Sequence, residues 1–194
     1  KTENRGLRDR GNVGMGVACG IYILFLDSDV YIEEGALSTI QNIINEQRNP
    51  DVIYFGFYKE KEKEKSGSIL YGYKSEKNHL YTGIEYAKNE LQRRVLSPAA
   101  CFGIYKREFL IANKLFFKVG TFHEDELWTP QVVMKADTIY VTDYAYYHYV
   151  KRDGSITTKK DKTQNGIDLV NICKELDDMF SNIEDSKLRR LLDN

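Results

Sequence analysis

The 194-residue chain has few cysteines, and their arrangement excludes two common kinds of site. Cys19, Cys101 and Cys173 are odd in number, lie far apart and form no C-x-x-C pair. This pattern argues against a zinc site or a disulfide framework and favours a reducing compartment. We expect each cysteine to pack as a small apolar residue.

Long apolar runs and net charge are also missing. No stretch approaches the ~18–20 apolar residues of a membrane span, and no signal peptide is visible. The 28 Lys and Arg residues nearly balance the 29 Asp and Glu residues. The net charge therefore gives the chain no general attraction to nucleic acid or to an anionic membrane surface. The length suits a single domain over 1–194. Because the chain begins at Lys1 without an initiator Met, we expect it to be a piece of a longer protein.

Strand and helix patterns alternate irregularly along the chain, which predicts an α/β fold with a mixed sheet. Leu37, Ile40 and Ile44 recur at helical spacing and predict a helix over 36–47. A capping box, in which Thr82 and Glu85 satisfy each other's backbone donors, predicts a helix start there. The alternating charges of 59–65 predict a solvated hairpin tip or a mobile loop.

The remaining elements follow from β-branched, aromatic and amphipathic runs. Strands are expected at 21–26, 51–58, 69–73, 101–105, 138–142 and 146–150. Further helices are expected at 12–18, at 107–113, after His123, and within 160–194 at the C-terminus.

Two carboxylates follow directly on a buried strand in "YILFLDSD", residues 22–29. Ionised Asp27 and Asp29 repel each other and cannot both remain charged in an apolar core. A turn that exposes them to water explains the pair, and so does a divalent cation held at the end of the strand. Carboxylate oxygens suit Mg²⁺ or Mn²⁺, which in turn bind phosphates. Ligands of open α/β sheets bind at such strand ends.

A second acidic cluster, "HEDE" at 123–126, has two interpretations as well. Acids stabilise the first turn of a helix through its dipole. Alternatively, a carboxylate here acts as a general base that removes a proton from an acceptor hydroxyl.

The third candidate segment is "YYHYVKRDGSIT", residues 146–157. His148 on an aromatic strand is typical of a satisfied core or edge residue. Together with Lys151, Arg152 and Ser155, however, the segment gathers hydrogen-bond donors suited to a diphosphate.

Two long segments resemble the family-2 glycosyltransferases, which are inverting GT-A enzymes of bacterial capsular, exopolysaccharide and lipopolysaccharide synthesis. They are "GNVGMGVACGIYILFLDSDVYIEEGAL" and "TFHEDELWTPQVVMKADTIYVTDYAYYHYVKRDGSIT". The resemblance covers about residues 6–157 and implies the GT-A fold, a mixed sheet flanked by helices. It also implies that the N-terminal nucleotide-binding half of that fold is missing, so that the fragment itself is inactive.

The resemblance implies a role for each matched residue. Asp27 would contact the donor ribose or the water shell of the metal, Asp29 would ligate Mg²⁺ or Mn²⁺, and Asp125 would be the catalytic base, with Glu124 as the other candidate. His148 would be a third group beside the metal.

Donor binding is implied for a further set of matched residues. Asn12 and Gly14 fall where the family binds the donor diphosphate, and Arg152 and Ser155 fall in a loop that closes over it. Two positions depart from the family pattern: Gly11 replaces an arginine, and Val30 replaces an acidic residue that often follows the Asp-Ser-Asp triplet.

The implied activity is transfer of a sugar, with inversion, from a nucleoside-diphosphate sugar to a glycan or lipid-linked acceptor. The implied location is the cytoplasm or the inner face of the cytoplasmic membrane, with peripheral association. Because the missing strands would leave a raw sheet edge, we expect the chain to self-associate. The alternatives are a non-catalytic carbohydrate-binding fragment and a haloacid-dehalogenase-type phosphatase, although Tyr31 stands where the phosphatases have Thr or Val.

Overall fold

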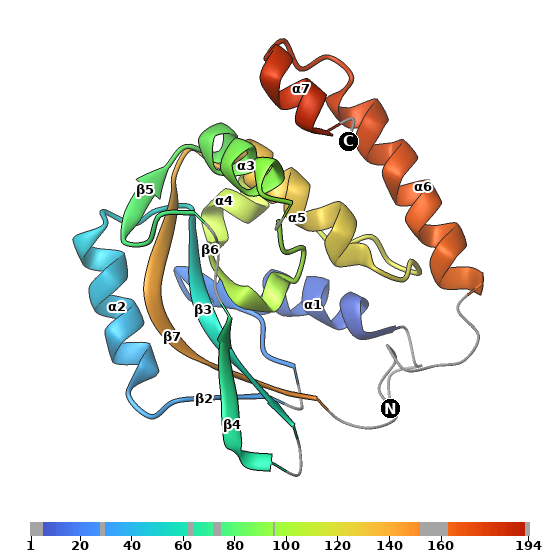
Figure 1. The fold of residues 1–194 in the computed structure, drawn as a ribbon. Coiled ribbons are helices and arrows are strands. Elements are labelled where there is room, and N and C mark those ends of the chain that lie inside the picture. Colours follow the sequence, from blue (N-terminus) through green and yellow to red (C-terminus); the bar gives the residue numbers. More distant parts are fainter. Residues whose placement is uncertain are drawn as a thin grey trace.

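A seven-stranded mixed sheet forms the centre of the computed structural model (Figure 1). The structure describes residues 6–27, 30–61, 64–71, 75–94, 96–151 and 163–192, with backbone only for 6–10, 61, 64–71 and 151. In chain order the elements are α1 (Gly6–Val17), β1 (Tyr22–Leu24), β2 (Val30–Ile32), α2 (Ala36–Glu46), β3 (Val52–Lys61), β4 (Glu64–Tyr71), β5 (His79–Tyr81), α3 (Gly83–Gln92), the 3-10 turn η1 (Ala100–Phe102), β6 (Gly103–Lys106), α4 (Arg107–Ala112), α5 (Glu124–Lys135), β7 (Ile139–Lys151), α6 (Thr163–Phe180) and α7 (Ser186–Leu192).

The long strands β3 and β7 pair in parallel and form the spine of the sheet, with Val52 opposite Ile139 and Lys61 opposite Lys151. Two short strands pair antiparallel with each outer edge of this spine. Strands β6 and β4 follow one another along β3, and β5 and β2 follow one another along β7. Strand β1 extends the sheet beyond β6, which gives the order β1-β6-β3-β7-β2.

Helices cover both faces of the sheet, which is why β3 reads as a continuous apolar run. Figure 1 shows α2 on one side and α1, α3, α4 and α5 on the other. Ile53 and Phe55 face α2, where they line a small space with Ile40. Tyr54 points the opposite way and stacks on Tyr86 of α3, with 5.1 Å between ring centroids. Helices α6 and α7 lie outside α5 and α3.

Several predicted elements are confirmed. The expected helix at 36–47 is α2, and the strand at 51–58 is the first part of β3. The capping box exists: the Glu85 amide donates to Thr82 Oγ1 at 3.3 Å, and the Thr82 amide donates to Glu85 Oε2 at 2.9 Å. Strands β3 and β4 form the hairpin expected around the charged run, and the tip residues 62 and 63 lie outside the described residues.

Other predictions are wrong in extent. Helix α1 begins at Gly6 rather than near Asn12, despite the low helix propensity of its glycines. The two strands predicted at 138–142 and 146–150 are the single strand β7, whose pairing with β3 shifts register between the pairs Tyr54–Val141 and Gly56–Ala145. The C-terminal region holds two helices, α6 and α7, instead of one.

Three side chains are more exposed than predicted. Leu37 does not belong to the core face of α2: it is 64% exposed, and the core face consists of Ala36, Ile40 and Ile44. Cys19 and Cys173 are also exposed, so the expectation that every cysteine packs as an apolar residue is wrong.

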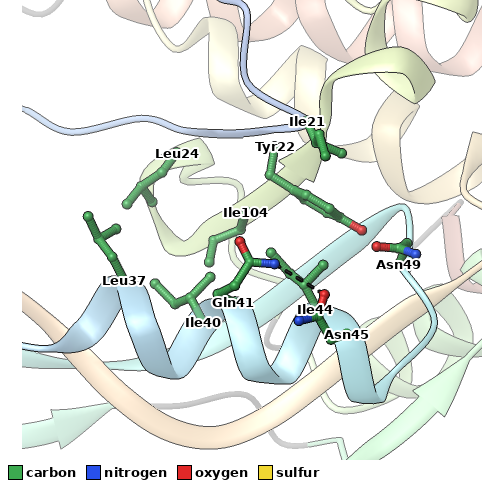
Figure 2. Close-up of a pocket in the computed structure, with 10 residues that line it drawn as sticks. All are labelled: Ile21, Tyr22, Leu24, Leu37, Ile40, Gln41, Ile44, Asn45, Asn49 and Ile104. Carbon is green, nitrogen blue, oxygen red and sulfur yellow. Dashed lines mark hydrogen bonds between the residues drawn. The ribbon is translucent and has the colours of Figure 1, made fainter.

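The edge strand β1 borders an apolar groove (Figure 2). Among the described residues, β1 pairs with β6 alone. Between β1 and α2 lies a cavity of about 430 Å³ lined by Ile21, Tyr22, Leu24, Leu37, Ile40, Gln41, Ile44, Asn45, Asn49 and Ile104. Ile21 is 73% exposed at this edge, so the sheet margin combines unpaired backbone with apolar side chains.

Within the described part of the chain, no helix combines the length and the apolar character that crossing a membrane requires.

The contact between α3 and α5 leaves no room for a side chain at Gly83. A Cβ atom there would lie 2.0 Å from the Val133 carbonyl oxygen and 2.7 Å from that of Ala136. Because these are backbone atoms, we expect Gly83→Ala to lower the free energy of unfolding by at least about 2 kcal/mol in urea denaturation. The matched control is Gly16→Ala in α1, where the space is open and a gain of about 0.5–1 kcal/mol is expected. Equal stability of Gly83→Ala and the wild type would contradict this packing.

Candidate active site

An aromatic cluster joins the two segments that carry the acids, although about a hundred residues of sequence separate them. Phe25, two residues before Asp27, packs edge-on against Trp128 of α5, with 5.8 Å between ring centroids. Phe117 joins both rings, at 5.3 Å from Phe25 and 4.6 Å from Trp128. Aromatic contacts of this kind contribute about 0.5–1.5 kcal/mol each. The cluster therefore holds the segment after β1 against the first turns of α5.

Asp27 lies on the side of the sheet that carries α5. It is half-buried near Tyr147, whose pKa is raised mainly by burial, with smaller contributions from Cys101 and then from Asp27. Tyr147 in turn contacts Phe102 of η1, with 5.7 Å between ring centroids. The predicted metal ligand Asp29 lies outside the described residues.

The first turn of α5 carries three consecutive acids, as the dipole of a helix favours. Glu124 is buried and faces the core with Leu127 and Trp128, whereas Asp125 is half-buried. His123 precedes the helix in a left-handed conformation, with φ 60°, and its side chain makes no capping hydrogen bond. The turn therefore places half-buried Asp125 three residues before Trp128, a member of the aromatic cluster.

Glu126 is the acid of this turn that the sequence did not single out. Burial raises the pKa of Glu126; the neighbouring Asp125 raises it further, and His123 lowers it. A carboxyl group with a raised pKa is a better proton acceptor, which is a useful property in general-base catalysis. The sequence shows Glu126 as one acid of the "HEDE" run. Its burial could not be predicted, because burial depends on tertiary packing.

Asn12 clamps α1 onto the loop that precedes α5. Its Nδ2 donates to the Phe117 carbonyl oxygen, and its Oδ1 accepts from the Phe117 amide, both at 2.8 Å. Gly11 lies against the ring of the same phenylalanine, since a Cβ atom there would be 3.3 Å from it. Asn12 thus has a structural role in the clamp, and its role in binding a donor diphosphate stays a prediction.

His148 belongs to a cluster of its own. Its ring stacks between Tyr31 and Tyr58, with centroids 4.3 Å and 4.8 Å away. Its Nδ1 lies 2.8 Å from Glu60 Oε1, and its Nε2 lies 3.4 Å from Glu33 Oε1. Both ring nitrogens therefore face carboxylates of β3 and of the turn after β2. The neighbouring Tyr147, not His148, lies by Asp27, so a role of His148 beside a metal stays a prediction.

The remaining predicted donors are not placed. Lys151 ends β7, but only its backbone is described, and Arg152 and Ser155 lie outside the described residues. Within the described ranges, no group of three His, Cys, Asp or Glu side chains is arranged to hold a metal ion.

Sequence comparison relates the chain to bacterial glycosyltransferases. No protein-family model matches it. It is 22% identical over 160 residues to the uncharacterized glycosyltransferase YibD of Escherichia coli K12, and this match covers 79% of the chain and 45% of YibD. It is 27% identical over 158 residues to the uncharacterized glycosyltransferase EpsJ of Bacillus subtilis, covering 79% of the chain and 44% of EpsJ. The minor teichoic acid biosynthesis protein GgaB of B. subtilis is 24% identical over 95% of the chain and 20% of GgaB.

The fold is that of a solved glycosyltransferase. The crystal structure of residues 1–349 of S. aureus TarS in complex with UDP-GlcNAc matches 97% of the chain with a TM-score of 0.75 and 21% identity. The chain is a relative of glycosyltransferases. It spans about half of that TarS chain (51%) and less than half of YibD and EpsJ. A partial glycosyltransferase fold therefore accounts for the mixed sheet and its flanking helices.

The raised pKa of Glu126 predicts a pH-dependent gain in stability on substitution. Above the folded-state pKa the wild type holds a charged, half-buried carboxylate, and this penalty disappears as pH falls below the unfolded value of about 4.3. Glu126→Gln should therefore raise the free energy of unfolding at neutral pH by less than about 1 kcal/mol and leave it unchanged near pH 3–4. Urea denaturation at both pH values measures this, with exposed Glu34→Gln as control. A gain that persists in acid would contradict the burial of a charged Glu126.

Proposed function

We propose that the protein containing this chain is a family-2 glycosyltransferase of the GT-A fold, acting with Mg²⁺ or Mn²⁺ and inverting the anomeric carbon. The observation that carries the proposal is the shared aromatic cluster: Phe25 and Trp128 hold the Asp27 segment and the acidic turn of α5 on one side of the sheet. Catalysis by displacement requires a donor site and a base held together in this way.

The chemistry is a single displacement. Asp125 accepts the proton of an acceptor hydroxyl, the oxygen attacks the anomeric carbon, and the bond from that carbon to the donor diphosphate breaks as the diphosphate departs. Glu124 is the alternative base, but its burial against the core makes it the less accessible of the two. Asp27 contacts the donor ribose or the water shell of the metal. The oxygen donors of Asp27 and Asp29 suit a hard divalent cation, which when bound would stabilise the departing diphosphate as a Lewis acid.

A nucleoside-diphosphate sugar is the proposed donor, because TarS, whose fold the chain shares, binds UDP-GlcNAc and UDP. A cell-surface glycan or a lipid-linked precursor is the proposed acceptor, in keeping with the name of the relative GgaB in minor teichoic acid biosynthesis. The proposed location is the cytoplasm, extending to the inner face of the cytoplasmic membrane. Because the chain spans about half of the TarS structure, we expect the 194 residues alone to lack transferase activity.

The test uses the full protein that contains this chain, with Mn²⁺ and a panel of UDP- and GDP-sugars. Asp125→Asn should lower the rate of sugar transfer or donor hydrolysis by about 10²-fold or more with donor affinity intact, because it removes the general base. Asp29→Ala and removal of the metal should both weaken donor binding, measured by calorimetry. Asp143→Asn, an exposed aspartate on β7, is the matched control.

Two results would contradict the mechanism. Donor binding that is unaffected by both metal removal and Asp29→Ala would exclude the metal-bound donor. An unchanged rate in Asp125→Asn would mean that Asp125 is not the base. The base would then be Glu124, or the turn would have no catalytic role. Binding of sugars without any turnover in the full protein would favour a carbohydrate-binding function.

Self-association of the 194-residue chain is a second part of the proposal. The outer margin of β1, which pairs with no strand in the part of the chain that the structure describes, is flanked by the exposed apolar side chains of Ile21 and Leu37 (Figure 2). This combination favours pairing with a second copy. Sedimentation velocity should detect dimers or larger species of the wild-type chain, and Ile21→Lys or Leu37→Lys should shift it toward monomer. Val170→Lys on α6, also an exposed apolar position, should leave the distribution unchanged. A monomer at every concentration of the wild type would exclude the association.

A further inference from the structure

The loop at 115–123, which leads into the acidic turn of α5, is held by three separate elements. At its start, Trp128 Nε1 of α5 donates to the Leu115 carbonyl oxygen at 3.0 Å. In its middle, the carboxamide of Asn12 in α1 bonds both backbone groups of Phe117. At its end, two side chains of α6 form hydrogen bonds with Phe122 and His123. The last of these contacts is the closest in sequence to Glu124 and Asp125.

The first α6 contact is a buried carboxylate. Asp168 is 8% exposed, and its Oδ2 accepts a hydrogen bond from the Phe122 amide at 2.8 Å. Its Oδ1 accepts from Gln164 Nε2, one turn earlier on α6, also at 2.8 Å. These bonds, the Phe122 amide first, hold the pKa of Asp168 below its usual range, so that the group stays ionised at neutral pH. A charged acceptor makes the hydrogen bond to Phe122 stronger than a neutral one would.

The second α6 contact holds the residue just before the helix. Asn165 Nδ2 lies 3.0 Å from His123 Nε2, and the amide donates to the ring nitrogen. Farther along α6, Glu175 forms an ion pair with Lys118 of the same loop. Asn165, Asp168 and Glu175 recur at spacings of three and seven residues, which places them on one side of α6, toward the loop.

The conformation of His123 explains why such support matters. A left-handed backbone at a residue other than glycine costs about 1–3 kcal/mol and persists only where the surroundings impose it. Because the side chain of His123 does not cap α5, the direction in which the helix starts is set by contacts from outside it. Asp168 and Asn165 supply these contacts at two consecutive residues, immediately before the acids.

We propose that Asp168 and Asn165 are positioning residues that hold the acidic first turn of α5 in its reactive orientation. The expected effect on catalysis rests on the proposed function, whereas the bracing of the loop rests only on the contacts of α6. It assigns to α6 a task that its amphipathic sequence does not reveal: α6 braces the loop that leads into the turn carrying the base.

The activity test compares variants of α6 in the full protein. Asp168→Ala should lower kcat about 10-fold to 10²-fold with little change in the KM for the donor, because a misdirected base affects the chemical step. Asp168→Asn should retain most of the activity, since its amide oxygen still accepts from Phe122. Asn165→Ala should show a smaller loss of kcat. The exposed Asp178→Ala and Asn171→Ala on the same helix are the matched controls.

The pH profile separates positioning from a general loss of folded protein. Partial unfolding lowers kcat equally at every pH, whereas a displaced base also shifts the pH of half-maximal kcat. We expect this shift in Asp168→Ala and not in Asp168→Asn. An unchanged profile and rate in both Asp168→Ala and Asn165→Ala would overturn the inference.

Amide hydrogen exchange of the 194-residue chain gives an answer that does not depend on activity. The amides from Phe122 to Glu126 should exchange faster in Asp168→Ala and Asn165→Ala than in the wild type, while the strands β3 and β7 stay protected. Exchange that is unchanged throughout 122–126 in both variants would overturn the inference. A full protein without any sugar transfer would instead overturn the proposed function, and exchange alone would then decide whether α6 fixes this turn.

Discussion

The parallel pairing of β3 with β7 is the constraint on which the other elements depend. These two strands run side by side from Val52 and Ile139 to Lys61 and Lys151, and every other strand of the described sheet except β1 pairs directly with one of them. This parallel pairing joins segments about ninety residues apart, because it brings residues 139–151 beside residues 52–61. The short strands then divide the outer edges of the spine between them, and helices cover both faces.

The two faces of this sheet carry different clusters of side chains around the candidate site. Alternation along β7 sends Tyr147 toward Phe102 and Asp27, and His148 toward Tyr31, Glu33 and Glu60. Adjacent residues of one strand therefore belong to different clusters. The face that carries α5 gathers Asp27 and the acidic turn around Phe25, Phe117 and Trp128. The opposite face supports α2 and the stacked rings around His148.

The segment before α5 shows how an irregular loop becomes a precise part of a site. Side chains of α1 and α6 bond to its backbone or side chains across 42 to 105 residues of sequence, and Trp128 of α5 bonds to Leu115 across 13 residues. Such bonds replace the repetitive ladder that a strand or helix would provide. They also offset the unfavourable backbone of His123. A helix turn that must be held rigidly at the end of a loop generally requires this kind of surrounding shell.

Local chemistry was enough to predict many individual elements. The Thr82 and Glu85 capping box, helix α2 and the β3–β4 hairpin depend on residues close in sequence, and the structure confirms them. The acidic motifs were recognisable for the same reason. Predictions of extent failed at the start of α1, which begins at Gly6, and in β7, which spans both predicted strands with a register shift against β3.

The sequence by itself determined where the acidic side chains of the candidate site lie along the chain and, through its resemblance to glycosyltransferases, the fold class to which they belong. Only the tertiary structure decided how these residues are used. It brought Phe25 onto Trp128, engaged Asn12 with Phe117, turned His148 away from Asp27, and set Asp168 against Phe122. The physical reason is that motifs record side-chain chemistry, whereas burial, facing direction and hydrogen-bond partners arise from contacts between segments far apart in the chain.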